Sequence, residues 1–300
     1  MQLNEYQQAA VATELHPGEE GLVIALLGLA GEVGELLSEY KKHLRDGEAH
    51  RLYTERIAEE LGDLLWYVAS VSHRFGISLN EIAERNILKN DARWGVRTGQ
   101  AAPEFALYDE QDRMDEQLPR TFTARVRYLD GSERDKVQLF LNGTPLGDPL
   151  TDNAYDEDGY RFHDIFHLAF AAILGWSPVV RKLLNVKRKS NSLTDQVEDG
   201  GRATAIEEGI AALIFAHAKS YNFYQGVQEV DSDLLQTVKQ MTAHLEVSSQ
   251  SVGQWEKAIL AGFAIWRQVV KYEPGEIQAD LRARTIVFIA EPQQTSEHGS

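Results

Sequence analysis

Two acidic motifs that recur in the same helical phase constrain this 300-residue chain more than any other feature. Glu32 and Glu35 stand three residues apart, and so do Glu60 and Asp63. At 100° per residue each pair lies on one face of a helix, beside an apolar stripe rather than opposite it. A charge that only keeps a helix soluble normally lies opposite that stripe. Two helices that pack antiparallel through their stripes would bring the four acids to one side of a helical core.

Four carboxylates on rigid helices suit a hard divalent cation such as Mg²⁺ or Mn²⁺, which takes oxygen ligands together with water and phosphate. We therefore expect Glu32, Glu35, Glu60 and Asp63 to be the metal ligands. Glu39 continues the acidic face of the first helix. Either Glu35 or Glu39 is a candidate to orient or deprotonate a catalytic water, and the sequence does not separate base from ligand.

A later helix, expected over 79–94, adds polar and basic groups. Asn86, Lys89 and Arg93 fall within an arc of about 60°. Lys89 and Arg93 would neutralise phosphate oxygens and stabilise a phosphate leaving group, and Asn86 would bind a sugar hydroxyl or a base edge. Trp66 is a candidate to stack on the base, and its alternative is packing in the core or at a dimer interface.

These motifs, with the strings GLAGEVGEL, EELGDLLWYV and NILKNDARW, resemble the MazG-like all-α nucleoside triphosphate pyrophosphohydrolases over roughly residues 4–97. Gly31 departs from the pattern, since the family often has an acid at that position. The resemblance implies hydrolysis of NTP or dNTP to the monophosphate and pyrophosphate, with Mg²⁺ held by the acids at 32, 35, 60 and 63. It also implies a homodimer or homotetramer.

The periodicity predicts a mainly α protein with two domains. A four-helix-type domain over 1–99, an acidic linker over 100–118, a β-hairpin plus helical domain over 119–291 and a disordered tail over 292–300 follow in order. Helices are expected over 4–14, 21–43, 52–75, 79–94, 162–175, 178–184, 203–221, 231–247 and 252–272. The hairpin would turn near Asp130-Gly131, with a further turn at Asn142-Gly143.

The second domain holds polar residues in apolar helices. His163 and His167 are helical neighbours in FHDIFHLAF, beside Asp164, and Glu207 and Glu208 interrupt another apolar helix. These five residues form either a second metal or phosphate site or a buried ion-paired network with Arg202 or Lys187. The basic stretch at 181–189 is a further candidate to receive phosphate or an acidic partner.

Composition narrows the setting. The chain has no cysteine, which excludes disulfides and thiolate sites and suits a cytoplasmic location. The net charge of −16 makes nucleic-acid binding an unfavourable reading, and no apolar run is expected to reach membrane-spanning length.

Three functions compete: an enzyme that hydrolyses nucleoside triphosphates, a Mg²⁺-nucleotide sensor that signals through the second domain with slow or no turnover, and a purely structural helical oligomer. Packing alone gives no reason for two phased acidic pairs beside the core, which speaks against the third.

Overall fold

The computed structural model describes residues 1–16, 18–94, 107–129, 136–271 and 275–290, without the side chains of 92–94. The predicted turn at Asp130-Gly131 and the predicted tail over 292–300 lie outside these residues. The chain divides into two compact units, Met1–Asp91 and Ala92–Ser300.

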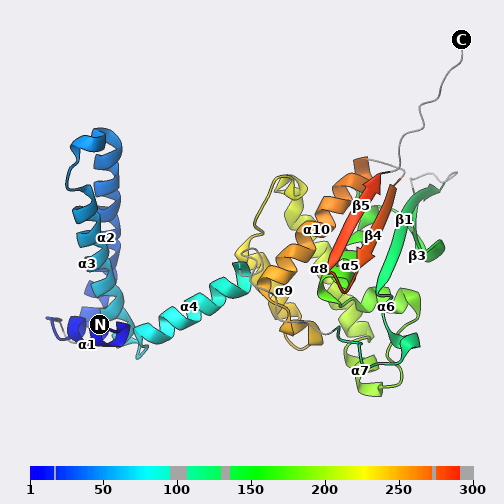
Figure 1. Ribbon diagram of the computed structural model, residues 1–300, viewed down its shortest axis with the longest axis horizontal. Coiled ribbons are helices and arrows are strands. Elements are labelled where there is room, and N and C mark those ends of the chain that lie inside the picture. Colours follow the sequence, from blue (N-terminus) through cyan, green and yellow to red (C-terminus); the bar gives the residue numbers. More distant parts are fainter. Residues whose placement is uncertain (17, 95–106, 130–135, 272–274, 291–300) are drawn as a thin grey trace, which may run out of the picture. The chain divides into compact units, whose positions relative to one another are not determined.

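The first unit is all α-helical, as predicted. Its elements are α1 (Leu3–Val11), α2 (Glu19–Asp46), η1 (Gly47–Ala49), α3 (Tyr53–Arg74) and α4 (Leu79–Trp94), the last of which runs past the end of the unit. Helices α2 and α3 lie side by side as a long hairpin, and α1 packs on α3 (Figure 1). Each predicted helix is present, with its ends shifted by a few residues.

Helix α4 begins with a side-chain cap. The Ser78 hydroxyl accepts a hydrogen bond from the backbone N–H of Glu81 at 3.1 Å, which satisfies one free donor of the first turn. The Glu81 carboxylate pairs with Arg85 instead of returning to the cap. The cap at Ser78 is therefore a single hydrogen bond and not a reciprocal pair.

The core of the first unit is thin. Its buried hydrophobic cluster consists of Ala10, Ala69 and Leu79. The buried amide of Gln7 adds a polar clasp, since its nitrogen donates to the carbonyl of Ile77 and its oxygen accepts from the backbone of Leu79. Many large apolar side chains are exposed on these helices, among them Leu15, Val23, Leu27, Leu37, Leu44, Leu61, Phe75, Ile87 and Leu88.

Helix α2 also corrects one expectation. By length and composition the segment Glu19–Ala49, with a mean hydropathy of 1.7, could cross a membrane, although no apolar run of that length was expected from the sequence. Only 11% of the apolar window is buried within the structure. Glu32 and Glu35 interrupt the segment, and carboxylates inside a bilayer are costly.

The second unit contains one antiparallel sheet of five strands in the order β3-β2-β1-β4-β5. The strands are β1 (Thr121–Leu129), β2 (Lys136–Leu141), β3 (Thr144–Leu150), β4 (Gly275–Asp280) and β5 (Thr285–Ala290). The predicted hairpin is β1–β2, and the predicted turn at Asn142-Gly143 leads into β3, where both residues have positive φ. The sheet is larger than expected because β4 returns from the chain's end to pair with β1, with Thr121 opposite Asp280.

Helices complete this unit. They are η3 (Tyr160–Phe162), α5 (Asp164–Leu174), α6 (Pro178–Leu184), α7 (Ser192–Val197), α8 (Gly201–Lys219), η4 (Asn222–Tyr224), α9 (Ser232–Met241), η5 (Glu246–Ser249) and α10 (Val252–Lys271). Helices α5 and α10 pack against each other and against β5, with α8 beside them (Figure 1). Every residue of α5 after Asp164 is buried, so this helix forms the centre of a large core.

The acidic linker predicted over 100–118 needs correction for the residues that are described. Asp109 and Glu116 are buried in the second unit rather than solvated. Asp109 accepts hydrogen bonds from the backbone of Leu118 and from Arg181, and Glu116 accepts from Ser190. Their partners come from residues far along the chain, so acidity alone was a poor guide to exposure.

Candidate active site

The acids of α2 and α3 meet on one side of the helical hairpin. Glu32, Glu60 and Asp63 place one carboxylate oxygen each within 4.8 Å of the others. Oxygens bound to one Mg²⁺ at about 2.1 Å lie roughly 3–4 Å apart, so small rotations would suit a shared cation. Glu32 and Glu60 are half-buried and Asp63 is exposed, which leaves the site open to water and substrate.

Like charge dominates this group. Burial, together with the negative charges of Glu32, Glu35 and Asp63, raises the pKa of Glu60. Among the described residues none of these four acids forms an ion pair. A divalent cation would relieve the repulsion, because it favours the ionised form of every carboxylate around it. The donor set therefore fits the expected metal, with Glu35 beside the three acids that converge.

Glu39 is differently placed. Its carboxylate is buried, pairs with Lys42, and lies 3.3 Å from Nε2 of His50. The hydrogen bond from Lys42 is the main cause that lowers the pKa of Glu39. A carboxylate held in this way is poorly suited to accept a proton from water, so the structure favours Glu35 over Glu39 for that role.

The polar residues of α4 are exposed. The amide oxygen of Asn86 accepts a hydrogen bond from Asn90 at 3.1 Å, and Lys89 extends into solvent. Among the described residues no hydrogen bond or ion pair joins either side chain to the acids. The side chain of Arg93 lies outside the described residues.

Trp66 is engaged in packing. Its indole N–H donates to the hydroxyl of Thr13 at 2.8 Å, and its ring packs on the small core around Ala69. Neighbouring Tyr67 covers Gly28, where an added Cβ would lie 2.2 Å from the phenol ring. Gly28 therefore permits the close approach of α2 and α3 near the acids.

Tyr6 of α1 is a residue near the acids that the sequence did not single out. Burial and the charge of Asp63 raise the pKa of its phenol. No periodicity could have indicated this, because α2 and η1 lie between α1 and α3 in the chain and the packing of α1 on α3 is a tertiary contact.

Both units match family models. Residues 23–95 match the MazG nucleotide pyrophosphohydrolase domain, and residues 103–292 match the MazG C-terminal domain. The Gene 37 protein of Mycobacterium phage L5 is 36% identical over 101 residues, which cover 31% of this chain and 89% of the relative. The chain belongs to the MazG family. No solved structure matches it. The acids of α2 and α3 thus lie in the MazG nucleotide pyrophosphohydrolase domain.

The MazG C-terminal domain brings the predicted histidines and glutamates together. His167 of α5 lies between two acids of α8, with Nδ1 at 2.9 Å from Glu207 and Nε2 at 3.3 Å from Glu208. His163 Nε2 lies 3.7 Å from Glu208 and 3.8 Å from Asp164. Neither of the predicted partners, Arg202 and Lys187, forms a described contact with this cluster.

The charges of His167, Glu207 and Glu208 affect one another strongly. Burial opposes charge on His167, but the negative charges and hydrogen bonds of Glu207 and Glu208 outweigh it and raise the pKa of His167 to about 10. The hydrogen bond from His167 is the main cause that lowers the pKa of Glu208. An imidazolium between two carboxylates is thus one chemical state that this MazG domain can adopt.

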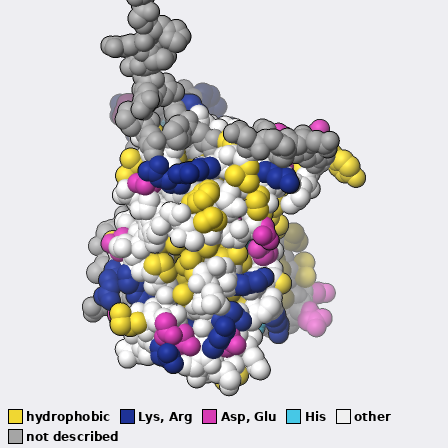
Figure 2. Space-filling model, turned by 90° about the vertical axis from the view of Figure 1, so that its right-hand side faces the viewer, with side chains coloured by type: hydrophobic (Ala, Val, Ile, Leu, Met, Phe, Trp, Pro, Cys, Tyr) yellow, Lys and Arg dark blue, Asp and Glu magenta, His cyan; other side chains and the backbone are white. Residues whose placement is uncertain are grey.

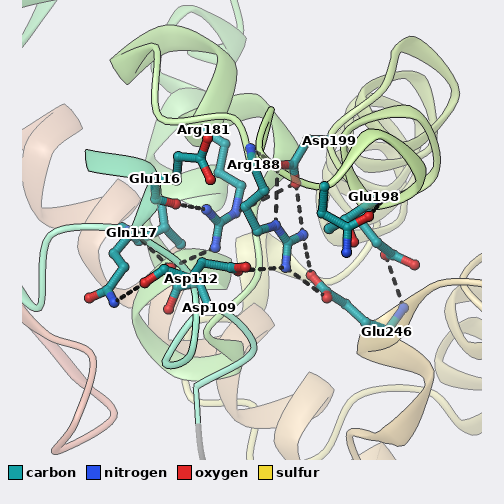
Figure 3. A network of polar contacts seen from close by, with 12 residues as sticks. Asp109, Asp112, Glu116, Gln117, Arg181, Arg188, Glu198, Asp199 and Glu246 are labelled. Carbon is teal, nitrogen blue, oxygen red and sulfur yellow. Dashed lines mark hydrogen bonds and ion pairs between the residues drawn. The ribbon is translucent and has the colours of Figure 1, made fainter. Parts of the chain in front are cut away.

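The basic stretch at 181–189 is mostly an internal network of the MazG domain (Figure 3). Arg181 and Arg188 are buried and converge on Asp199, while Arg188 also pairs with Glu246. Lys187 pairs with Asp195 at 2.9 Å. The interpretation of this stretch as a phosphate-binding patch is wrong for the two arginines, because their charges are already neutralised inside the protein.

Proposed function

We propose that the chain hydrolyses nucleoside triphosphates, NTP or dNTP, to the monophosphate and pyrophosphate with Mg²⁺, or Mn²⁺ in its place. The observation that carries this proposal is the convergence of Glu32, Glu60 and Asp63 beside Glu35, with no ion pair to a cationic side chain in the described part of the chain. Membership of the MazG family, in a domain described as a nucleotide pyrophosphohydrolase, supports it.

The side chains divide the work in this proposal. Glu32, Glu60 and Asp63 hold the cation, which when bound supplies a polarised water and neutralises phosphate charge. Glu35 would orient a water for in-line attack on the α-phosphorus and would accept its proton. Lys89 stabilises the pyrophosphate leaving group, and Asn86 binds the sugar or base.

We infer that the enzyme works as a homodimer or homotetramer. Leu27, Leu37 and Leu44 of α2 are each more than 60% exposed. Such a row of apolar side chains on one helix marks a surface that needs a partner. A second copy of the hairpin is the partner we propose.

The setting is proposed on chemical grounds. A cytoplasmic location accords with a chain without cysteine. Nucleic acid is an unfavourable partner at a net charge of −16, and the face of the second unit in Figure 2 intersperses acidic with basic side chains. We assign no membrane partner, since the acids of α2 would have to enter the bilayer.

Pyrophosphate release from the eight common NTPs and dNTPs, with and without Mg²⁺, tests the proposal. Glu60→Gln is the variant, and Glu59→Gln is the matched control, because Glu59 is exposed on the same helix and pairs with Arg56. Loss of one metal ligand should lower kcat/KM by roughly 100-fold or more, while the control stays near wild type. Equal turnover by the two variants, or no release from any substrate, would overturn the proposal.

A second candidate is a Mg²⁺-nucleotide sensor with slow or no turnover that signals through the C-terminal domain. Two observations support the sensor function: the C-terminal domain is the larger of the two units, and it contains a polar cluster of its own. Tight Mg²⁺-dependent binding of a nucleotide without pyrophosphate release would select the sensor.

A further inference from the structure

In both histidines of the C-terminal domain the Nδ1 atom has a hydrogen-bond acceptor as its neighbour, and the Nε2 atom lies near a carboxylate of Asp164 or Glu208. His163 Nδ1 lies 2.9 Å from the carbonyl oxygen of Tyr160, and His167 Nδ1 lies 2.9 Å from Glu207. Both partners are acceptors, so each Nδ1 carries the hydrogen. In a neutral ring the lone pair is then on Nε2, which is the arrangement that holds a metal-binding histidine in one tautomer.

Glu207 contacts the Nδ1 atom of His167 and so leaves Nε2 to other groups. It is completely buried, accepts from the Ser177 hydroxyl at 2.6 Å and the Val179 backbone at 2.8 Å, and also meets His167. Three donors satisfy its two oxygens. A carboxylate that orients an imidazole in this way is the usual second layer of a metal site.

The distances from the two Nε2 atoms to the nearest carboxylate oxygens are long for hydrogen bonds. Glu208 lies 3.3 Å from one Nε2 and 3.7 Å from the other, and Asp164 lies 3.8 Å from His163. Good hydrogen bonds between these atom types are about 2.7–3.2 Å long. Ligand atoms at about 2.1 Å from one tetrahedral ion are instead roughly 3.4 Å apart, close to these separations.

Asp164 supplies a further observation. Its side chain is 15% exposed, and among the described residues its carboxylate accepts no hydrogen bond. One of its oxygens lies within 4.8 Å of a ring nitrogen of both His163 and His167. A largely buried carboxylate directed at two imidazole lone pairs is costly unless a cation or a proton joins them.

We propose that His163, Asp164, His167 and Glu208 bind one divalent first-row transition metal ion, such as Zn²⁺ or Mn²⁺, in the C-terminal domain. Two imidazoles with two carboxylates favour such an ion over Mg²⁺, which prefers oxygen ligands alone. The Glu208 side chain is 44% exposed, so the ion reaches the site from that side and keeps a face open to a small ligand. The site is separate from the acids of α2 and α3 and does not depend on their function.

The competing state is an imidazolium at His167 that ties α5 to α8 through Glu207 and Glu208. In that state a proton takes the place of the metal, and the cluster serves packing alone. The two states differ in metal content and in the response to metal, so they can be separated without any activity assay.

The experiment uses the full-length chain carrying Glu60→Gln and Asp63→Asn, which removes the first site as a metal binder. Calorimetric titration with Zn²⁺, Mn²⁺ and Mg²⁺ should show one equivalent of Zn²⁺ or Mn²⁺ bound far more tightly than Mg²⁺. Added Co²⁺ should give visible absorption bands that report nitrogen and oxygen ligands around the ion.

Glu208→Gln is the test variant, because its exposed side chain can change without disturbing the core. It should weaken metal binding by roughly 100-fold or more, and Glu207→Gln by about 10–100-fold. His244→Ala is the control, since His244 is exposed on another part of the domain. Asp164→Asn replaces Glu208→Gln if circular dichroism shows that the latter fails to fold.

Two results would overturn the proposal. The first is no stoichiometric binding of Zn²⁺, Mn²⁺ or Co²⁺ in the starting protein. The second is binding that survives Glu208→Gln and Asp164→Asn in folded protein, or that is lost with His244→Ala. Either result would leave the cluster as a protonated ion pair.

Discussion

The two units of this chain place polar groups in opposite ways. In the first, Glu32, Glu60 and Asp63 converge beside Glu35 on a hairpin with a small apolar core, and among the described residues no protein cation pairs with them. In the second, Arg181 and Arg188 are about 1% exposed, as are Asp109 and Asp199, and the four interlock inside a large core. We propose that a cation, a substrate and another subunit complete the first arrangement. The second is satisfied within the fold.

The contrast distinguishes charged groups placed to bind a ligand from charged groups that stabilise the fold. Acids that raise one another's pKa store repulsion that ligand binding can release. Buried arginines with several acceptors each fix where loops and helices sit, and removal of one partner leaves an uncompensated charge. Variants in the two units should therefore fail in different measurements.

The largest expected effect on stability is at Asp109. Asp109→Ala removes the acceptor of Leu118, Arg120 and Arg181 and should lower the free energy of unfolding of the second unit by about 3–5 kcal/mol. Urea denaturation of the full chain measures this. Asp115→Ala is the control, because its ion pair with Arg113 is two-thirds exposed and should contribute less than about 1 kcal/mol. If both variants lost the same free energy of unfolding, burial would not make the Asp109 ion pairs more stabilising than the exposed Asp115 pair.

The contribution of Asp109 should also depend on pH. Burial opposes ionisation of Asp109, but the charge of Arg181 and the hydrogen bond from Leu118 outweigh it and lower its pKa. A lowered pKa means stability that is present above the ordinary value of about 3.8 and is lost as the pH falls through the folded value. The stability difference between wild type and Asp109→Ala, measured by urea titration, should shrink below pH 4 and stay constant from pH 5 to 7.

The first unit should instead respond to changes of its apolar surface. Leu37→Asp removes a side chain that is 61% exposed in the single chain and that we place at the subunit interface. Burial of a leucine contributes about 1.5–3 kcal/mol, so the change should weaken subunit association by roughly 10–100-fold. Sedimentation equilibrium checks this. Leu193→Asp, at a leucine that is 68% exposed in the second unit, should leave the oligomer intact.

Sequence reasoning was strongest where a pattern is local and periodic. The four predicted helices of the first unit are confirmed, because the apolar periodicity that predicts each helix lies within its own segment of the sequence. The convergence of acids from two helices could be predicted because both motifs stand in the same phase beside the stripes that pack. The pairing of Glu39 with His50 could not, since it depends on how η1 returns the chain.

Sequence reasoning was weakest where partners are distant in the chain. Strands β4 and β5 follow a long helical region, and β4 pairs with β1 across a large separation in sequence, with Thr121 opposite Asp280. Asp109 looked like a solvated linker charge, yet Arg181 lies 72 positions away in sequence and buries it. The histidines and glutamates of α5 and α8 could be named as a group, but the tautomers that their neighbours impose required the structure.

The smallest expected effects compare two helix caps. Ser78 accepts only the Glu81 N–H in the first unit, so Ser78→Ala should cost about 1 kcal/mol. Ser177 caps α6 through the Val180 N–H and also donates to the buried Glu207, so Ser177→Ala removes a cap and leaves a carboxylate oxygen short of a donor. We expect about 2 kcal/mol or more for Ser177→Ala, measured by chemical denaturation. A cost no greater than that of Ser78→Ala would mean that Glu207 keeps its charge and position without the hydroxyl, and would remove Ser177 from the support of His167.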